Sequence, residues 1–152
     1  MKKIYLAGNI SANLDTYKWR DLATELLKDR YIIINPAANP FNKDLLKKYD
    51  DDPEKFKKMA VKKSQGILIS KDYQLVMESD IILVNMAIIT PEKPLIGTLF
   101  ELAWSWEHNK PVIAVVGDNW WCKHPFPVDS FSAVADSVEE ACDLIKYFFV
   151  EG

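Results

Sequence analysis

The sequence predicts a single-domain α/β protein, residues 1–152, built on a sheet of about five parallel strands. Short runs of aliphatic and β-branched residues recur along the chain, and they alternate with segments whose apolar residues follow helical spacing. This alternation indicates parallel strands joined by helical crossovers, with helices on both faces of the sheet. The chain has 152 residues, nearly half of them apolar, which is enough to bury a proper core.

The amino-terminal part begins with an apolar strand at residues 3–7, closed by the turn-forming sequence Gly8-Asn9-Ile10-Ser11. We expect a helix over residues 13–29 and a second strand over residues 31–34. In the helix, the apolar stripe comprises Trp19, Leu22, Leu26 and Leu27. The side chains expected to face solvent are Lys18, Arg20, Asp21 and Lys28.

Residues 42–63 differ in composition, because Lys and Asp dominate and apolar residues are sparse. We expect a helical insert there, made of one or two short exposed helices broken at Pro53. Such a charge mixture is typical of a solvated face, although an insert of this kind can also serve as a lid. A further helix is expected from near Ile69, with Tyr73, Val76 and Met77 inward.

The central unit, residues 79–116, reads as strand, loop, helix and strand. The strands are expected at 81–84 and 112–116, and the helix between them at 98–108. After Gly117 we expect a long loop and then a short last strand at 132–135. Ser137, with Glu140 at the third helical position, predicts a capping box at the start of the final helix.

A flavodoxin-like, Rossmann-like three-layer sandwich with strand order 2-1-3-4-5 is the most economical arrangement of these elements. It places the loops after the first and third strands side by side, at the carboxyl edge where open α/β sheets bind ligands. The Gly8 loop and residues 85–97 should therefore face each other across one crevice.

Glu101 is the most unusual residue near this crevice. We expect it in the first turn of its helix, after Gly97, where the helix dipole would hold the carboxylate ionised. An ionised, positioned carboxylate is what nucleophilic attack on a sugar carbon requires. The alternative is that Glu101 merely complements the dipole of its own helix.

Composition narrows the function classes. The formal net charge of −3 gives no reason to expect a nucleic-acid partner. Cys122 and Cys142 lack metal-ligand spacing and suggest free thiols in a reducing compartment. His108 and His124 have no ligand partner at a suitable spacing, so we expect neither a metal nor a cofactor. We find no signal peptide and no membrane-spanning run, and expect a cytoplasmic protein.

Several segments together resemble the nucleoside 2-deoxyribosyltransferase superfamily. They are Ile4-Tyr5-Leu6-Ala7-Gly8, Trp19-Arg20, Asp72, Ser79-Asp80, Gly97-Thr98-Leu99-Phe100-Glu101-Leu102-Ala103 and Lys110-Pro111-Val112-Ile113. The resemblance spans most of the chain except residues 42–63 and the carboxyl terminus. That superfamily includes transferases that exchange nucleobases on 2′-deoxyribose and N-glycosidases that hydrolyse 2′-deoxynucleoside 5′-phosphates.

The resemblance implies a role for individual residues. Glu101 matches the nucleophile, Tyr5 a tyrosine that hydrogen-bonds it, and Asp72 the acid that engages the departing base. Without the resemblance, Tyr5 reads as a half-buried strand aromatic and Asp72 as a helix-cap or surface acid. Further residues expected to bind substrate are Gly8, Asn9, Ser11, Asn85 and Gly97.

The sequence departs from the superfamily pattern in two places. Leu95 stands where the transferases carry another acid that contacts the sugar, and Glu92 could substitute only if its loop folds back. The ending Phe149-Val150-Glu151-Gly152 does not resemble the polar carboxyl terminus that transferases lend to a neighbour's sugar site.

Three functions remain open from the sequence. The first is transfer of 2-deoxyribose between nucleobases, with a nucleoside and a free nucleobase as small-molecule partners. The second is hydrolysis of nucleoside 5′-monophosphates, with the backbone of residues 8–11 cradling the phosphate, although no Arg or Lys occurs in that loop before Lys18. The third is a non-catalytic nucleotide-sensing module on the same fold.

A homo-oligomer, a dimer or larger, is also expected. The chain carries more large aromatic residues around one helix and its following loop than a small domain easily hides, namely Trp104, Trp106, Trp120, Trp121 and Phe126. The resemblance implies the same, because related enzymes complete their active sites with a neighbouring subunit. The alternative is that these aromatics cover the sheet edge within one subunit.

Overall fold

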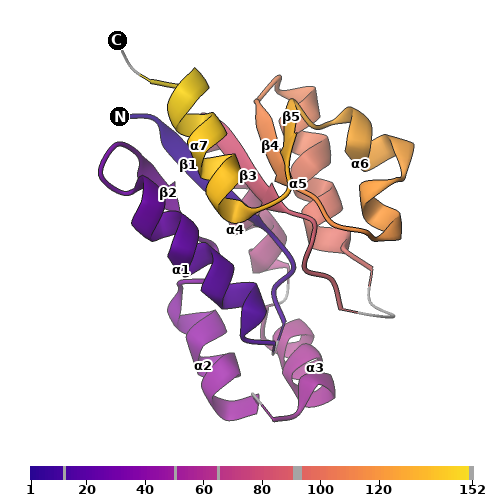
Figure 1. The fold of residues 1–152 in the computed structure, drawn as a ribbon. Helices are drawn as coiled ribbons and strands as arrows, with labels where there is room; N and C mark the ends of the chain where they lie inside the picture. The colour runs from indigo at the N-terminus through magenta and orange to yellow at the C-terminus, as the bar shows by residue number, and fades with distance from the viewer. Residues whose placement is uncertain (12, 50, 65, 91–93, 151–152) are drawn as a thin grey trace.

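A computed structural model describes residues 1–11, 13–49, 51–64, 66–90 and 94–150. Its centre is a five-stranded parallel sheet in the order β2-β1-β3-β4-β5, which confirms the predicted topology (Figure 1). The strands are β1 (Lys3–Gly8), β2 (Ile32–Ile34), β3 (Ile81–Asn85), β4 (Val112–Val115) and β5 (Ala133–Ala135).

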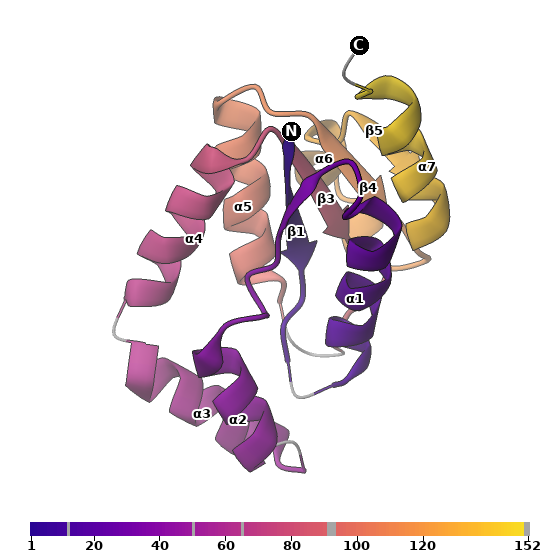
Figure 2. The ribbon, with the colours of Figure 1, turned by 90° about the vertical axis from the view of Figure 1, so that its left-hand side faces the viewer.

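Helices cover both faces of this sheet and give the predicted three layers (Figure 2). Helices α1 (Asp15–Leu27) and α7 (Val138–Phe148) lie on one face, and α4 (Ile67–Glu78) and α5 (Ile96–Glu107) lie on the other. The remaining helical elements are α2 (Pro40–Tyr49), α3 (Pro53–Ser64), the 3₁₀ turn η1 (Trp120–Cys122) and α6 (Pro125–Asp129). No described helix is both long and apolar enough to cross a bilayer.

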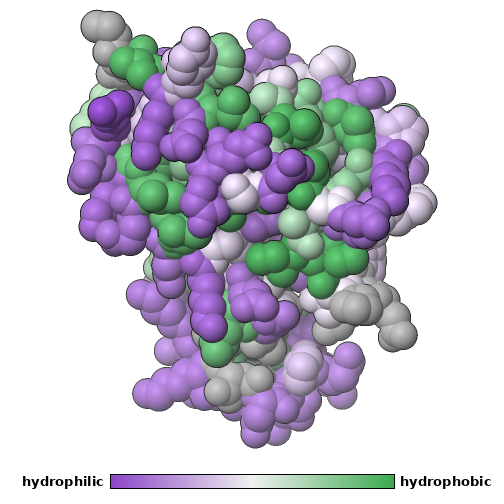
Figure 3. All heavy atoms as spheres, viewed as in Figure 1, coloured by the Kyte–Doolittle hydropathy of each residue, from purple (hydrophilic) through white to green (hydrophobic). Residues whose placement is uncertain are grey.

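The helices predicted for residues 42–63 are present as α2 and α3, at the end of the molecule toward which β1 points (Figure 2). Their part of the surface is mainly hydrophilic (Figure 3). Pro53 starts α3, where a missing N–H costs nothing, and the Asp52 carboxylate caps this helix by accepting the Lys55 N–H at 3.1 Å. The break at Pro53 is therefore the boundary between two helices.

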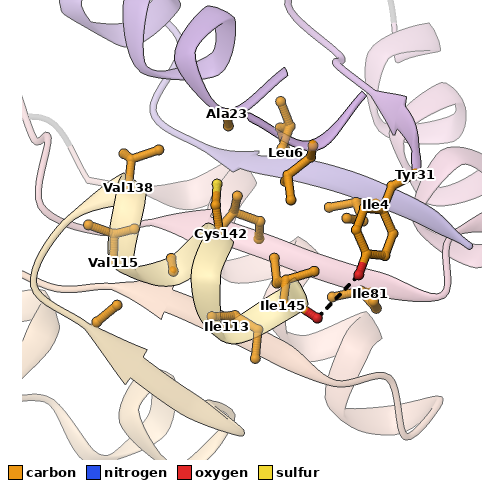
Figure 4. Close-up of a cluster of buried hydrophobic side chains, with 14 of the residues drawn as sticks. Ile4, Leu6, Ala23, Tyr31, Ile81, Ile113, Val115, Val138, Cys142 and Ile145 are labelled. Carbon is orange, nitrogen blue, oxygen red and sulfur yellow. Dashed lines mark hydrogen bonds between the residues drawn. The ribbon is translucent and has the colours of Figure 1, made fainter. Parts of the chain in front are cut away.

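The strands bury side chains on both faces, and β1 shows the alternation. Ile4 and Leu6 pack with α1 and α7, whereas Tyr5 and Ala7 face α4 and α5. The cluster of side chains between the sheet and helices α1 and α7 is almost purely apolar (Figure 4). Its Tyr31 hydroxyl donates to the Ile145 carbonyl at 3.3 Å.

Polar side chains form hydrogen bonds with the backbone at the ends of several helices and strands. Lys110 donates from Nζ to the Met77 and Ser79 carbonyls at 3.0 and 2.6 Å, which caps the carboxyl end of α4. The Asp80 carboxylate accepts the Lys3 N–H at 2.8 Å. The Ser137 hydroxyl caps α7 as predicted, while Glu140 reaches back to the N–H of Asp136 at 2.9 Å.

Several side chains lie otherwise than predicted. Arg20 is fully buried and not solvated, while Leu22 and Tyr73 are exposed. The segment after Gly117 is not a long loop but contains η1 and α6. These short helices form because Asn119 and His124 each accept a backbone N–H at the first turn.

Candidate active site

A pocket of about 240 Å³ opens at the carboxyl edge of the sheet. It brings together the loop after β1, the segment after β2, helix α4 and the start of α5. Its lining residues are Gly8, Asn9, Ile10, Pro36, Asp72, Pro94, Leu95, Ile96, Gly97, Thr98 and Glu101. The Asn9 side chain donates to the Thr90 hydroxyl at 2.8 Å, so the loops after β1 and β3 do face each other as predicted.

Glu101 lies in the second turn of α5 and not in the first, because the helix begins at Ile96. Its side chain is 6% exposed. Burial raises the pKa of Glu101 to about 8, against the hydrogen-bonding influence of Tyr5, and the Asp72 charge raises it further. The expectation of a carboxylate held ionised by the helix dipole is therefore wrong, since that effect fades beyond the first turn and desolvation exceeds it.

Tyr5 lies on β1, fully buried and directed toward Glu101. Burial raises the pKa of its phenol far above the ordinary value, and the charges of Glu101 and Asp72 add to this effect. The hydroxyl therefore stays protonated and serves as a donor. It is close enough to Glu101 to lower that carboxyl's pKa, although the contact does not meet the geometric criteria of a hydrogen bond.

Asp72 comes from α4, which packs beside α5 on the same face of the sheet, and it lines the same pocket as Glu101. Its side chain is 26% exposed, yet the Oδ1 atom is buried and has no hydrogen-bond partner. Burial raises the pKa of Asp72, while the Lys71 ammonium, 3.3 Å from Oδ1 but poorly aligned for a hydrogen bond, lowers it. The carboxyl can thus carry a proton more readily than an ordinary surface aspartate.

Two of the predicted substrate-binding residues shape the loops rather than line the pocket. The Ser11 hydroxyl accepts the Asn13 N–H at 3.1 Å, just before α1. The Asn85 side chain accepts the Ala87 N–H at 3.0 Å and fixes the turn after β3.

Gly8 is required by its surroundings. Its φ of +148° disfavours any side chain, and a Cβ there would lie 3.1 Å from the Asn85 carbonyl oxygen and 3.2 Å from the Trp19 ring. Gly97 lines the pocket without such a constraint, because a Cβ there would meet nothing within 4 Å.

Arg20 belongs to this site although sequence reasoning placed it in solvent. Its guanidinium donates to the carbonyls of Gly8 at 3.0 Å, of Asn9 at 3.1 Å and of Thr16. The available signal was its place on the buried stripe of α1, one turn after Thr16 and three residues before Ala23.

Among the described residues, the buried side-chain polar atoms without a partner belong to Arg20 and to residues that interact with it electrostatically. They are the hydroxyls of Tyr5 and Tyr17, Nε of Arg20 and Oδ1 of Asp72. Arg20 interacts electrostatically with both tyrosines, with Asp72 and with Glu101. Folded proteins rarely leave such atoms unpaired, and a concentration of them with perturbed pKa values indicates a functional site.

Comparison with solved structures places this arrangement among known folds. The chain aligns with a 2-deoxyribosyltransferase from Leishmania mexicana at a TM-score of 0.65 and 14% identity, over 99% of this chain and 100% of that one. For the 2-deoxyribosyltransferase from Bacillus psychrosaccharolyticus the TM-score is 0.61 at 19% identity, with 93% and 90% covered. A CMP N-glycosidase from Clostridium botulinum gives 0.52 at 14% identity, with 97% and 99% covered.

The chain shares the fold of these two 2-deoxyribosyltransferases and of the CMP N-glycosidase. At the level of sequence, no protein-family model matches it and no curated protein matches it. The likeness covers nearly the whole chain, so the fold that the resemblance implied is confirmed.

Within the described part of the chain, no three His, Cys, Asp or Glu side chains cluster as a metal site would require. Both cysteines are free, and burial raises the pKa of the Cys142 thiol to about 11, which leaves it a poor nucleophile. Glu92, Glu151 and Gly152, which the sequence raised as possible sugar contacts or departures, lie outside the described residues. Leu95 is 3% exposed and offers the sugar only an apolar contact.

A second hollow, of about 630 Å³, lies between α5 and the η1–α6 segment. We call it the aromatic groove; it is lined by Leu99, Leu102, Ala103, Trp106, Trp120, Trp121, His124, Phe126, Pro127, Asp129 and Ser130. The side chains of Trp106, Trp120 and Phe126 are 70%, 61% and 84% exposed. The groove is larger than the pocket around Glu101, but the strongly perturbed carboxyl groups are in the pocket.

Proposed function

We propose that this protein cleaves the N-glycosidic bond of 2′-deoxynucleosides through Glu101 and transfers the 2-deoxyribose to another nucleobase. The observation that carries the proposal is that Tyr5, Asp72 and Arg20, each with a buried polar atom that lacks a partner, all interact with one buried carboxyl group, that of Glu101. The shared fold with 2-deoxyribosyltransferases supports the same chemistry.

In the first step, ionised Glu101 attacks the anomeric carbon from the face opposite the base. The bond from that carbon to the base nitrogen breaks, its electron pair goes to the base, and Asp72 delivers a proton to the base. Positive charge that develops on the sugar is stabilised by the Glu101 carboxylate, which becomes an ester. Tyr5, held neutral by burial, orients the carboxylate by donating toward it.

In the second step, a nitrogen of another base attacks the anomeric carbon and releases Glu101 as a carboxylate. The proton lost from the incoming base returns to Asp72. Two displacements at the same carbon give retention of configuration. Water in place of the second base would turn the same site into a hydrolase.

The raised pKa values of Glu101 and Asp72 are compatible with these steps. At pH 7 a Glu101 group with a pKa of about 8 holds a proton for most of the time. The reaction needs that proton on Asp72, whose pKa is also raised. A basic ring nitrogen of the bound base favours protonated Asp72, and the positive charge that develops at the sugar in the transition state favours ionised Glu101, so the proton is expected to pass from Glu101 to Asp72 before the bond between sugar and base breaks.

Hydrolysis of nucleoside 5′-monophosphates is the second candidate, favoured by the fold shared with a CMP N-glycosidase. The described lining of the pocket offers such a phosphate no Lys or Arg side chain. Arg20, the nearest described guanidinium, is engaged by carbonyls, and Lys71 lies against Asp72. We therefore rank the nucleoside above the nucleotide as substrate. A non-catalytic sensor is disfavoured because Tyr5 and Asp72 both lie close enough to Glu101 to shift its pKa.

We further propose that the aromatic groove is the contact surface of a homo-oligomer, most simply a two-fold dimer. Its exposed aromatic side chains, which come from α5, η1 and α6, form an apolar face of the kind that associates with a second copy. Light scattering at micromolar concentration tests this, and a strictly monomeric mass would rule it out.

The activity is tested by incubating the protein with each 2′-deoxynucleoside and each 5′-monophosphate, with and without free adenine. Chromatography separates the products. A new deoxynucleoside that forms only with adenine identifies a transferase, and free base without adenine identifies a hydrolase. Conversion of the 5′-monophosphates alone would reverse our ranking of substrates, and inertness toward all of them would refute the proposed function.

A further inference from the structure

Arg20 is a buried charge that the described residues do not neutralise through an ion pair. Its side chain is fully buried, and its guanidinium donates to the backbone carbonyls of Gly8, Asn9 and Thr16 rather than to a carboxylate. Burying a guanidinium without a counter-ion is costly, and an apolar side chain of similar length would avoid that cost. The retention of an arginine here calls for a role beyond packing.

One part of that role is mechanical. The guanidinium binds the carbonyls of Gly8 and Asn9, and these two residues form one wall of the pocket. The neighbouring Trp19 completes the unit, because its ring packs against Gly8 and lies 4.7 Å from the guanidinium carbon. The Trp19-Arg20 pair therefore clamps the loop after β1 from the side of α1.

The other part is electrostatic. The groups that face Glu101 are Tyr5 from β1, Asp72 and Lys71 from α4, and Arg20 from α1. Arg20 keeps its proton at neutral pH, since burial lowers its pKa only to about 10, and Glu101 is the strongest of the groups that counteract this lowering. Lys71 lies beside Asp72 at the partly exposed edge, so Arg20 is the cation buried deepest near the nucleophile.

We propose that Arg20 is a positioning residue of this site: it clamps the Gly8–Asn9 wall, and its fixed positive charge favours the ionised form of Glu101. The second half rests on the proposed function only for its catalytic consequence. The charge relation itself exists whether or not the protein turns over a nucleoside.

Two substitutions separate the two halves. Arg20→Gln removes the charge but keeps two N–H donors for the carbonyls. Arg20→Lys keeps the charge but cannot bridge two carbonyls with a planar fork. Lys18→Gln is the matched control, because it removes one positive charge from an exposed position on the same helix.

The pKa of Glu101 can be read directly from the ¹³C shift of its carboxyl carbon, assigned with Glu101→Gln. We expect Arg20→Gln to raise the midpoint by about one unit or more, and Arg20→Lys and Lys18→Gln to leave it within a few tenths. In activity, the pH at half-maximal kcat/KM should rise with Arg20→Gln by the same amount. Arg20→Lys should instead raise KM about tenfold with little change in the pH profile.

A folded Arg20→Gln protein with an unchanged Glu101 midpoint would overturn the electrostatic half. Wild-type KM and kcat in Arg20→Lys would overturn the clamp, and this variant serves if Arg20→Gln does not fold. A shifted Glu101 midpoint in a protein that acts on no nucleoside would support the charge relation and refute the proposed function instead.

Discussion

Helix α5 separates the pocket of about 240 Å³ from the aromatic groove of about 630 Å³. The pocket side of the helix carries Thr98 and Glu101, both buried. The groove side carries Leu99, Ala103 and Trp106 at helical spacing. One helix therefore presents two faces that are hollowed in different ways.

The difference shows that the size of a hollow does not identify a site. The groove could hold more atoms, but it offers apolar area and few groups that change charge near neutral pH. The pocket is smaller, yet it holds carboxyl groups whose pKa values burial raises, together with polar atoms that lack partners. Chemistry needs convergent, perturbed groups, whereas association needs exposed apolar area.

Among substitutions on the two sides of α5, those on the pocket side should have the largest effect on the reaction rate. Glu101→Gln should lower base exchange by on the order of a thousandfold or more, because it removes a covalent nucleophile and retains its shape. Initial rates with a deoxynucleoside and free adenine measure this loss. Glu107→Gln, exposed on the same helix, should keep normal turnover. Near-normal exchange by folded Glu101→Gln would contradict the assignment.

Asp72→Asn should give the next largest effect. The amide can hydrogen-bond a ring nitrogen but cannot deliver a proton, so we expect a loss of about a hundredfold with natural bases. With a nitrophenyl deoxyriboside, whose leaving group needs no proton, the loss should shrink to a few-fold. Comparing kcat on both substrates, with exposed Glu78→Gln as control, measures the ratio. Equal losses on the two substrates would show that Asp72 is not the acid.

Stability should move in the opposite direction from activity. The pKa of Glu101 rises from 4.5 to about 8 on folding, so the folded state prefers the protonated form. Below pH 4.5 Glu101 is protonated in both states and does not change the free energy of unfolding. As the pH rises toward 8, Glu101 increasingly lowers this free energy, because the ionised group of the unfolded chain must regain a proton to fold. Glu101→Gln removes this cost and should raise the free energy of unfolding by about 2–3 kcal/mol at pH 7.

Urea unfolding of both proteins at pH 4, 7 and 8.5 checks this linkage. The gain should be near zero at pH 4 and largest at pH 8.5. A gain that does not depend on pH would show that Glu101 has an ordinary pKa in the folded protein.

The sheet and its strand order could be predicted because its central strands are recognisable from the sequence alone. Strands β3 and β4 are buried at every position, and residues 81–84 and 112–115 therefore appear as continuous apolar runs. The cap at Ser137 and the boundary at Pro53 also depend only on local chemistry. Where a property is decided within a few residues of the chain, the sequence predicts it.

The properties that failed to show in the sequence depend on partners far along the chain or on unusual caps. Arg20 is buried because the carbonyls of Gly8 and Asn9 accept hydrogen bonds from its guanidinium, and the signal for this in the sequence is only its place on the buried stripe of α1. The pKa of Glu101 depends on burial among Tyr5 and Asp72, which only the packed sheet brings together. Helix α6 begins at a histidine cap, an unusual signal next to two prolines.

The smallest effect on chemistry is expected from the groove side. Phe126→Asp places a charge on the most exposed aromatic side chain of the groove, 84% accessible in the single chain. If a second copy covers this surface, burying the new carboxylate would cost several kcal/mol and the oligomer should dissociate. Tyr147→Asp is the matched control, because Tyr147 is 79% exposed on α7 and lies outside the groove.

Sedimentation at micromolar protein should show a reduced mass for Phe126→Asp alone. The rate of the Glu101 step in saturating substrate should change by less than about tenfold, because the pocket lies on the other side of α5. Equal masses for the two variants would show that the groove is not the contact surface. A loss as large as that of Glu101→Gln would show that the two sides of α5 are not independent.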